Sequence, residues 1–360
     1  MKDHILIVGA GVAGLMTAIE LAQAGVKSRL FDTGRVGMES SWAGGGILSP
    51  IYPWLYPDAV NDLAQWSTQH YPEYLTQLFN ETSIDPEWLT SWHLILQTDL
   101  NTPTITQWAS KFSIQLQQLN QQQLHEIEPT LSPEFSHGLW LPEIGQVRNP
   151  RFVQALKAHA EKLGVSIHEN TEISRILHDD QQVTGIKSKT DRITADRVLI
   201  TAGAWSSSFK MGSSQPDIQP VKGQMIQFQT PPGSIKRITL HEGRYVIPRK
   251  DGKVLTGSTL EHCGFDKSTD EQTRQELHDV ATSIYPMLGS TPVINHWSGL
   301  RPGNERQIPY IGQHPEINGL YFNTGHYRNG IVIGLASARL AADLITDKPP
   351  ILSPEPYSLQ

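Results

Sequence analysis

The chain begins with a buried-strand pattern that runs directly into closely spaced glycines. Residues 5–8 form a continuous apolar run, as expected of a parallel strand that is covered on both faces. Gly9, Gly11 and Gly14 follow in the spacing G-x-G-x-x-G. In that pattern the first glycine allows a tight turn, the second lets the backbone approach a pyrophosphate, and the third lets the helix pack close to the strand. The first segment is therefore predicted to be a dinucleotide-binding βαβ unit.

The residues after the glycines complete this unit. Apolar side chains recur at helical spacing over residues 15–22, and Gly25 stands where a C′ glycine would end the helix. Asp32 follows the second strand, where a carboxylate can accept hydrogen bonds from an adenosine ribose. The carboxylate disfavours the 2′-phosphate of NADP, although Arg35 is near enough to leave that exclusion incomplete. These residues alone leave NAD and FAD open.

Composition excludes several classes of protein. The 360 residues suffice for two domains, and the net charge of -7 without a basic block argues against a nucleic-acid partner. Cys263 is the only cysteine, which excludes an intrachain disulfide and a cysteine-based zinc site, and we predict no metal. No apolar run is long enough for a transmembrane helix. Because a core strand starts near Met1, we expect no signal peptide and a cytoplasmic protein.

The segment over residues 34–56 is rich in glycine and has few regular signals. Such a loop usually follows a ligand, and the alternative is a flexible surface loop. A helix is predicted from about Asp58, with Asp58 as a candidate cap and an interruption at Pro72. Another helix is predicted from Asn149 as N-cap, with Pro150 as its first residue and Gly164 after its end.

The remaining pattern predicts two kinds of sheet. A hairpin around residues 179–181 and an apolar strand over residues 197–202 are assigned to the first sheet. From residue 221 the pattern becomes antiparallel, with a hairpin signal at residues 251–252. A capping box at residues 268–271 is predicted to open a helix, and a last helix is predicted from Gly330 to about Ile345.

We therefore predict an α/β protein: a Rossmann-like dinucleotide-binding domain with an inserted antiparallel-β substrate domain. The first domain is expected to be discontinuous, over residues 1–85, 149–220 and 298–360. The second is expected over residues 86–148 and 221–297.

Three features suggest a binding site for an anionic substrate. Arg301 stands between a strand and a Pro-Gly turn, which suits bidentate binding of a carboxylate; the alternative is a structural salt bridge. Tyr245 could donate a second hydrogen bond to that carboxylate, or it could be a core tyrosine. Residues 325–330 precede the last helix, whose N-terminus would stabilise the negative charge of a reduced flavin. A plain helix start with Asn329 as cap is the alternative.

The chain resembles the FAD-dependent amine oxidoreductase family that includes D-amino-acid oxidase and sarcosine oxidase, and within it the glycine oxidases of the thiamine pathway. The resemblance covers nearly the whole chain. It rests on residues 9–14, 40–46, 221–224, 245–249, 299–303, 309–312 and 325–330. Gly243 and Leu260 depart from what is common in the family, which leaves the substrate range open.

The resemblance implies which residues contact FAD. The bound FAD is expected to be non-covalent, because Cys263 does not lie in the segment that some members use for attachment, and Cys263 is expected to be a small structural residue. The implied FAD contacts are Gly9, Gly11, Val12, Ala13, Gly14, Asp32, Thr33, Ser40, Ser41, Gly45, Gly46, Ile47, Ile173, His326, Tyr327, Arg328, Asn329, Gly330 and Ile331. Arg301 would bind the substrate carboxylate, with Tyr245 and Arg328 assisting.

The resemblance also implies oxidative deamination of glycine or of another small amine or D-amino acid. A hydride would pass from the α-carbon to flavin N5, so no side chain is assigned a catalytic role. The imine would hydrolyse to a keto acid and ammonia, and O2 would be reduced to hydrogen peroxide. The expected partners are a small amino-acid substrate and O2, the expected pathway role is in thiamine thiazole synthesis, and self-association as a homo-oligomer is left open.

Two alternatives stay open at this stage. One is a D-amino-acid dehydrogenase that passes electrons to a quinone-type acceptor. The other is an FAD domain that acts on an aminomethyl group of tRNA. The second alternative needs a basic face or a partner domain, and the acidic composition does not supply such a face.

Overall fold

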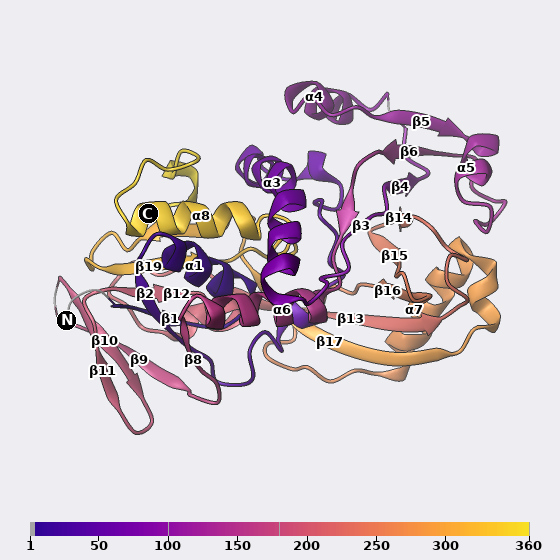
Figure 1. Cartoon of the computed structure of the whole chain (residues 1–360). Coiled ribbons are helices and arrows are strands. Elements are labelled where there is room, and N and C mark those ends of the chain that lie inside the picture. The colour runs from indigo at the N-terminus through magenta and orange to yellow at the C-terminus, as the bar shows by residue number, and fades with distance from the viewer. Residues whose placement is uncertain (1–3, 100, 180, 360) are drawn as a thin grey trace.

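A computed structural model describes residues 4–99, 101–179 and 181–359. Two large sheets dominate it, one at each end of an elongated molecule (Figure 1). The first has six strands in the order β18-β19-β12-β1-β2-β8. Its strands are β1 (His4–Val8), β2 (Lys27–Phe31), β8 (Ser166–His168), β12 (Val198–Ile200), β18 (Tyr310–Gln313) and β19 (Leu320–Thr324). The predicted α/β fold class is confirmed.

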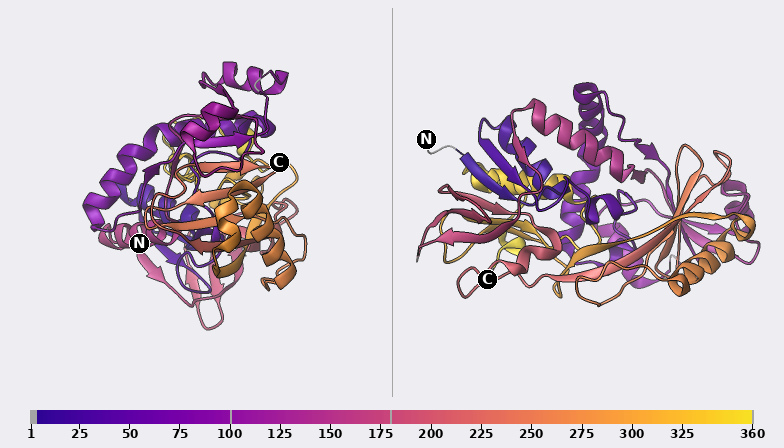
Figure 2. Two further views of the ribbon diagram at one scale, coloured as in Figure 1. Left: turned by 90° about the vertical axis from the view of Figure 1, so that its right-hand side faces the viewer. Right: turned by 90° about the horizontal axis from the view of Figure 1, so that it is seen from below.

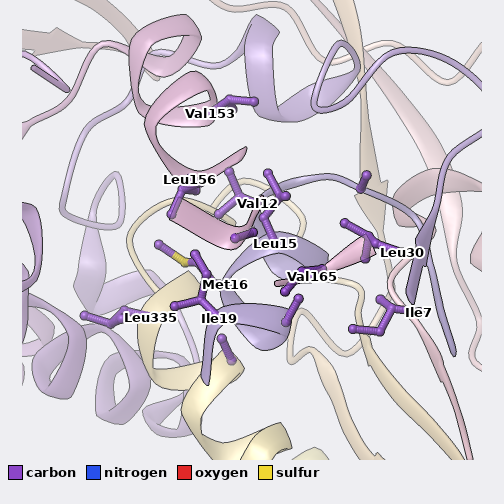
Figure 3. Packing of buried hydrophobic residues seen from close by; sticks show 14 of the residues in the cluster. Ile7, Val12, Leu15, Met16, Ile19, Leu30, Val153, Leu156, Val165 and Leu335 are labelled. Atoms are coloured by element: carbon purple, nitrogen blue, oxygen red, sulfur yellow. The ribbon is translucent and has the colours of Figure 1, made fainter. Parts of the chain in front are cut away.

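The predicted βαβ unit forms the centre of the six-stranded sheet. β1 pairs in parallel with β2 on one side and with β12 on the other. Helix α1 (Val12–Gln23) joins β1 to β2, and Gly25 follows it with a positive φ of 81°. Helices α6 (Asn149–Lys162) and α8 (Gly334–Ile345) pack against α1, and α3 (Asp58–Thr82) packs against α6 and α8. Figure 3 shows the core between them, where Leu15, Met16 and Ile19 meet Leu156 and Leu335.

The second sheet has eight strands in the order β17-β13-β16-β15-β14-β4-β6-β5. They are β4 (His93–Leu96), β5 (Gln117–Asn120), β6 (His137–Leu141), β13 (Gln219–Gln229), β14 (Ile238–His241), β15 (Arg244–Pro248), β16 (Lys253–Gly257) and β17 (Val293–Gly303). All neighbours are antiparallel except β4 and β14. Helix α7 (Glu271–Ile284) buries Leu277, Ala281 and Ile284 against this sheet. The predicted antiparallel region is confirmed, and Asp251-Gly252 forms the turn between β15 and β16.

The long paired strands β13 and β17 connect the two halves of the molecule. Figure 2 shows them running side by side from the centre of the molecule into the eight-stranded half. The division into two domains stays a prediction. β17 runs without a break across the expected boundary between residues 297 and 298.

Smaller elements fill the connections. β3 (Leu89–Thr90) pairs with β7 (Gly145–Gln146), and helices α4 (Pro103–Lys111) and α5 (Gln121–Ile127) flank β5. The glycine-rich segment over residues 34–56, which shows few regular signals, contains two short helices, α2 (Ser40–Ala43) and the 3-10 helix η1 (Pro53–Leu55). The remaining 3-10 turns are η2 (Gly203–Ser208), η3 (Pro286–Ser290) and η4 (Glu355–Tyr357).

The predicted interruption at Pro72 is wrong. Helix α3 runs through this proline, which lies on the exposed face. Tyr71 and Leu75 on the opposite face are buried in the core, so packing holds both halves of the helix in line despite the lost backbone hydrogen bond. The cap of this helix is Pro57, and Asp58 is its first residue.

At two helix starts the structure differs from the prediction because of local hydrogen bonds. Asn149 is the first residue of α6 and does not cap it: Arg148 is the N-cap, Nδ2 of Asn149 donates to the carbonyl of Ser41 at 2.8 Å, and its Oδ1 has no partner among the described residues. The predicted capping box before α7 is also absent. There Asp270 is the N-cap and accepts from the Thr273 amide at 2.8 Å, while Ser268 donates to another carboxylate.

The last helix starts later than predicted. α8 begins at Gly334, and an irregular turn over residues 331–333 separates it from Gly330. The amide of Ile333 donates to the carbonyl of Asn329 at 3.0 Å, so Asn329 takes part through its backbone rather than as a side-chain cap. A helix N-terminus therefore does not directly follow residues 325–330.

The predicted hairpin forms, but it belongs to a sheet of its own. β9 (Ile173–His178) pairs with β10 (Val183–Ser188), and β11 (Arg192–Thr194) completes three strands. Of its predicted turn over residues 179–181, Asp180 lies outside the described residues. The following strand, β12, does join the first sheet as predicted. Within the described ranges, no helix is both long and apolar enough to cross a membrane.

Candidate functional site

A cavity of about 720 Å³ extends from the glycine turn after β1 to the paired strands β13 and β17. It brings together segments that are far apart in the sequence. The predicted site residues that line it are Gly9, Gly11, Val12, Ala13, Asp32, Thr33, Ser40, Ser41, Gly45, Gly46, Ile47, Ile173, Tyr245, Arg301, His326, Tyr327, Arg328, Gly330 and Ile331. Gly14 and Asn329 are the two predicted site residues that do not line it.

The glycine turn fixes how closely β1, α1 and β12 approach one another. Gly9 has a φ of 109°, and a Cβ there would lie 2.9 Å from the Cα of Ala202. A Cβ on Gly14 would lie 2.8 Å from Oγ1 of Thr201. Gly14 therefore acts in helix–strand packing, as its place in the motif predicts, and not at the cavity wall.

The N-terminus of α1 faces the cavity. Its N-cap is Gly11, which has no side chain to cap it, and no acidic residue stands in its first turn. The amide of Val12 donates to Oγ of Ser41 at 3.0 Å, which holds the start of α2 against this helix end. The positive end of the helix dipole, with no carboxylate in the first turn, suits an anionic phosphate group, so this end of the cavity fits a pyrophosphate.

Asp32 is held in place beside the glycine turn. Its Oδ2 accepts from the amide of Ala10 at 2.7 Å and its Oδ1 accepts from the amide of Gly34 at 2.9 Å. Each carboxylate oxygen can accept more than one hydrogen bond, so the group can still receive a ribose hydroxyl. Thr33 and Ile173 line the same end of the cavity.

A buried arginine shapes the middle of the cavity, and sequence reasoning gave it no role. Nη2 of Arg249 donates to the carbonyl of Gly45 at 2.8 Å, and Nη1 donates to the carbonyl of Val147 and to Oε1 of Gln146 at 2.9 and 2.6 Å. Burial lowers the pKa of Arg249 to about 10. Arg249 therefore fixes the chain over residues 45–47, which lines the cavity wall.

The segment after β19 closes the far end. His326 is buried, and its Nε2 lies 3.0 Å from Oγ of Ser337 on α8. Burial lowers the pKa of His326 to about 4, so this imidazole is neutral near neutral pH. Tyr327 and Arg328 follow it and face the cavity.

Arg301 on β17 is partly buried, and its guanidinium lines the cavity. Nη1 donates to the carbonyl of Thr259 at 3.2 Å and Nη2 donates to Oγ of Ser258 at 2.5 Å. Burial lowers the pKa of Arg301, and the nearby Tyr245 opposes that shift. Across residues 4–99, 101–179 and 181–359 no carboxylate forms an ion pair with it, so the structural salt bridge considered above is not formed there. A partly buried cation without an acidic partner fits an anionic ligand.

Gly223 on β13 provides the space that this guanidinium occupies. β13 and β17 pair antiparallel, with Val221 opposite Arg301 and Gly223 opposite Gly299. A Cβ on Gly223 would lie 2.5 Å from Cζ of Arg301, which is far inside van der Waals contact. The glycine is thus a requirement of the arginine side chain, and only the tertiary structure reveals it.

Tyr245 and Arg328 lie on the same cavity as Arg301. The hydroxyl of Tyr245 donates to Sδ of Met225 at 3.8 Å, which is a weak acceptor, and Tyr245 also interacts with the guanidinium of Arg301, whose pKa it raises. Tyr245 also belongs to a buried cluster, so the core role considered above and a ligand contact are compatible. Within the part of the chain that the structure describes, Arg328 forms no ion pair.

Several lining residues were missed by sequence reasoning. They follow β12 or come from the β13–β16 region: Thr201, Ala202, Gly203, Ala204, Trp205, Gly223, Met225 and Ser258. The strand that runs into Thr-Ala-Gly was a usable signal, because ligands bind at the carboxyl ends of parallel strands. Cys263 is exposed, so its expected structural role is wrong. In the described ranges no group of three or more His, Cys, Asp or Glu residues could hold a metal ion.

Comparison with known proteins agrees with this geometry. The family described as FAD dependent oxidoreductase matches residues 4–344. Glycine oxidase of Pseudomonas aeruginosa is 42% identical over 361 residues, which cover 99% of each chain. The crystal structure of glycine oxidase from Geobacillus kaustophilus superposes with a TM-score of 0.93 at 26% identity, and the match covers 100% of this chain and 99% of that one. The chain therefore belongs to the family of FAD-dependent oxidoreductases.

Proposed function

We propose that the chain is an FAD-dependent oxidase that deaminates glycine or a similarly small amine or D-amino acid. The observation that carries the proposal is the partly buried guanidinium of Arg301, which has no acidic partner among the described residues and lies at the end of a cavity whose other end fits a dinucleotide. Relatives that match this chain over their whole length are named glycine oxidase, which supports a small amino acid as substrate.

The residues of the chain bind and orient the substrate. Arg301 binds the carboxylate through a charge-assisted, bidentate pair, and Tyr245 and Arg328 contact the same group. Fixing the carboxylate sets the direction of the α-carbon, which is the positioning that this chemistry needs. FAD, when bound, supplies the hydride acceptor. No side chain is assigned a proton-transfer role, and the neutral His326 serves the structure of the loop beside it.

The overall reaction is balanced by water and O2. Glycine, water and O2 would give glyoxylate, ammonia and hydrogen peroxide, with two electrons passing from the substrate to oxygen. Non-covalent FAD, a cytoplasmic location, self-association and a role in thiamine thiazole synthesis belong to the same proposal.

The test replaces Arg301 by Ala in the FAD-loaded enzyme and measures kcat/KM for glycine with an oxygen electrode. Losing a charge-assisted pair should lower kcat/KM by about ten- to a hundredfold or more. Arg192→Ala, an exposed arginine on the separate β9–β11 sheet, is the matched control and should change nothing. An Arg301→Ala enzyme with the full kcat/KM for glycine would contradict the assignment of Arg301 to carboxylate binding.

The same assay separates the oxidase from a quinone-linked dehydrogenase. Glycine, sarcosine and D-alanine are each added to the enzyme in air, and oxygen uptake is followed. If the substrates bleach the visible spectrum of the flavin without oxygen uptake, the acceptor is not O2 and the dehydrogenase reading replaces the oxidase.

A further inference from the structure

Arg301 is held by a loop, and that loop is itself tied to β13 by buried polar side chains. Both groups that accept from the guanidinium, the carbonyl of Thr259 and Oγ of Ser258, belong to the segment over residues 258–270 between β16 and α7. The position of the guanidinium in the cavity therefore depends on where this segment lies.

Lys222 is the central tie between the segment and the sheet. Its side chain is only 6% exposed, and Nζ lies 2.9 Å from Oε2 of Glu261 and 3.2 Å from Oδ2 of Asp266. It also donates to the carbonyl of Ser268 at 3.1 Å. The backbones of Lys222 and Glu261 exchange two hydrogen bonds, of 2.9 and 3.0 Å.

Gln224, two residues further along β13, makes similar contacts with the same segment. Its Nε2 donates to Oε1 of Glu261 at 3.1 Å and to Oδ2 of Asp270 at 2.9 Å. Its amide donates to Oγ1 of Thr259 at 2.8 Å. Side chains alternate between the two faces of a strand, so Lys222 and Gln224 point to one face while Gly223, between them, makes room for Arg301 on the other.

Thr259 joins the two faces. Its carbonyl accepts from Nη1 of Arg301, and its hydroxyl bonds to Glu261, the residue that Lys222 and Gln224 both hold. A continuous chain of contacts therefore runs from Lys222 through Glu261 and Thr259 to Arg301.

We propose that Lys222 is a positioning residue for substrate binding, which acts through Glu261 and Thr259 to fix the guanidinium of Arg301. The proposal rests on the proposed role of Arg301 in carboxylate binding. The hydrogen bonds to Glu261 and Asp266 raise the pKa of Lys222 against the opposing effect of burial, so the lysine is charged at neutral pH and can hold both carboxylates.

The proposal predicts a selective loss of carboxylate binding. In the FAD-loaded enzyme, Lys222→Met should raise the Kd of acetate, measured by calorimetry, by about tenfold. It should raise the KM for glycine to a similar extent and leave the limiting rate of flavin reduction within about threefold of the parent. Acetate is used because it carries the carboxylate of glycine without the amine.

Conservative variants separate positioning from general stability. Lys222→Arg keeps the charge and should recover most of the affinity for acetate. Glu261→Gln, at a side chain that is 29% exposed, should raise the Kd of acetate by about threefold. If Lys222→Met does not fold with FAD, the Kd of acetate measured for Glu261→Gln tests the proposal instead. Lys162→Met, on the remote helix α6, removes an exposed ion pair between Lys162 and Glu81. It should change neither the Kd of acetate nor the KM for glycine.

Two outcomes would overturn the inference, and a third would overturn its premise. A Lys222→Met enzyme with the parental Kd for acetate contradicts it, as does a lowered rate of reduction at unchanged affinity. If Arg301→Lys also leaves the Kd of acetate unchanged, the carboxylate role of Arg301 fails instead. If Arg301→Lys weakens acetate and Lys222→Met does not, only the positioning role of Lys222 is lost.

Discussion

The two ends of the cavity are built in different ways. At the end near β1, the wall is mostly backbone, formed by a glycine turn and a helix N-terminus, with the carboxylate of Asp32 held by two amides. At the end near β17, the wall is side chains, with Arg301, Tyr245 and Arg328 drawn from three separate segments.

The difference follows from what each end is proposed to hold. A pyrophosphate can be bound by amides and by the dipole of one helix, all of which come from a continuous stretch of chain. A carboxylate at a defined angle to a reactive ring needs a guanidinium in a fixed place, and that place is set by a neighbouring strand and a loop. The end near β1 is therefore built by residues that are close in sequence, and the end near β17 by residues that only the tertiary structure brings together.

Breaking the local end should have the largest effect. Gly9→Val requires a side chain at a φ of 109° and within 2.9 Å of the Cα of Ala202, so the turn cannot keep its shape. We expect the purified protein to lack the visible absorption of FAD. Gly25→Ala is the control, because its φ is also positive, at 81°, but nothing lies within 4 Å of its added Cβ. A Gly9→Val protein with one FAD per chain would show that the turn does not hold the cofactor.

Disrupting the end of the cavity near β17 should leave FAD bound. Gly223→Ala puts a methyl group where the guanidinium of Arg301 lies, and its Cβ would be 2.5 Å from Cζ. The displaced arginine should raise the KM for glycine by about a hundredfold, because displacements of about 1 Å have costs of that order. Steady-state kinetics on the yellow protein measure this, with Gly233→Ala, whose added Cβ meets nothing, as control. Loss of FAD together with glycine affinity would mean that the two ends are not independent.

This contrast also explains what the sequence could predict. The strand, the glycines and Gly25 follow rules that act over a few residues, so the βαβ unit was placed correctly. The start of α8 was placed four residues early, because a turn at Asn329 replaces the first helical turn and only packing selects it.

The roles of two residues that act through tertiary contacts could not be predicted. Gly223 and Arg249 lie in segments that carry the family resemblance, but their roles depend on a guanidinium across a strand pair and a carbonyl far along the chain. Pro72 gave a strong local signal for a break, and core packing of Tyr71 and Leu75 overrode it.

Each half of the molecule contains a buried histidine, and the effect of these histidines on stability in acid is expected to be smaller than the effects above. His326 beside the cavity has a hydroxyl partner at 3.0 Å, whereas both ring nitrogens of His93 on β4 lack one among the described residues. Burial lowers the pKa of each imidazole to about 4. The unfolded chain therefore takes up protons that the folded chain refuses as the pH falls below the ordinary value of 6.5, and stability is lost between there and pH 4.

Removing His93 should make stability less sensitive to acid. At pH 5 its share of the loss is about 2 kcal/mol, because pH 5 lies roughly one and a half units below the ordinary pKa and above the folded-state pKa. His93→Leu should be close to neutral at pH 7, since an unpartnered polar ring is exchanged for an apolar side chain in an apolar core. Thermal unfolding of the FAD-loaded enzyme at pH 7 and pH 5 measures the difference, with the exposed His178→Leu as control. If His93→Leu loses as much stability on acidification as the parent, His93 is protonated in the folded state. The acid sensitivity would then come from the cavity end, where His326 is retained in both proteins.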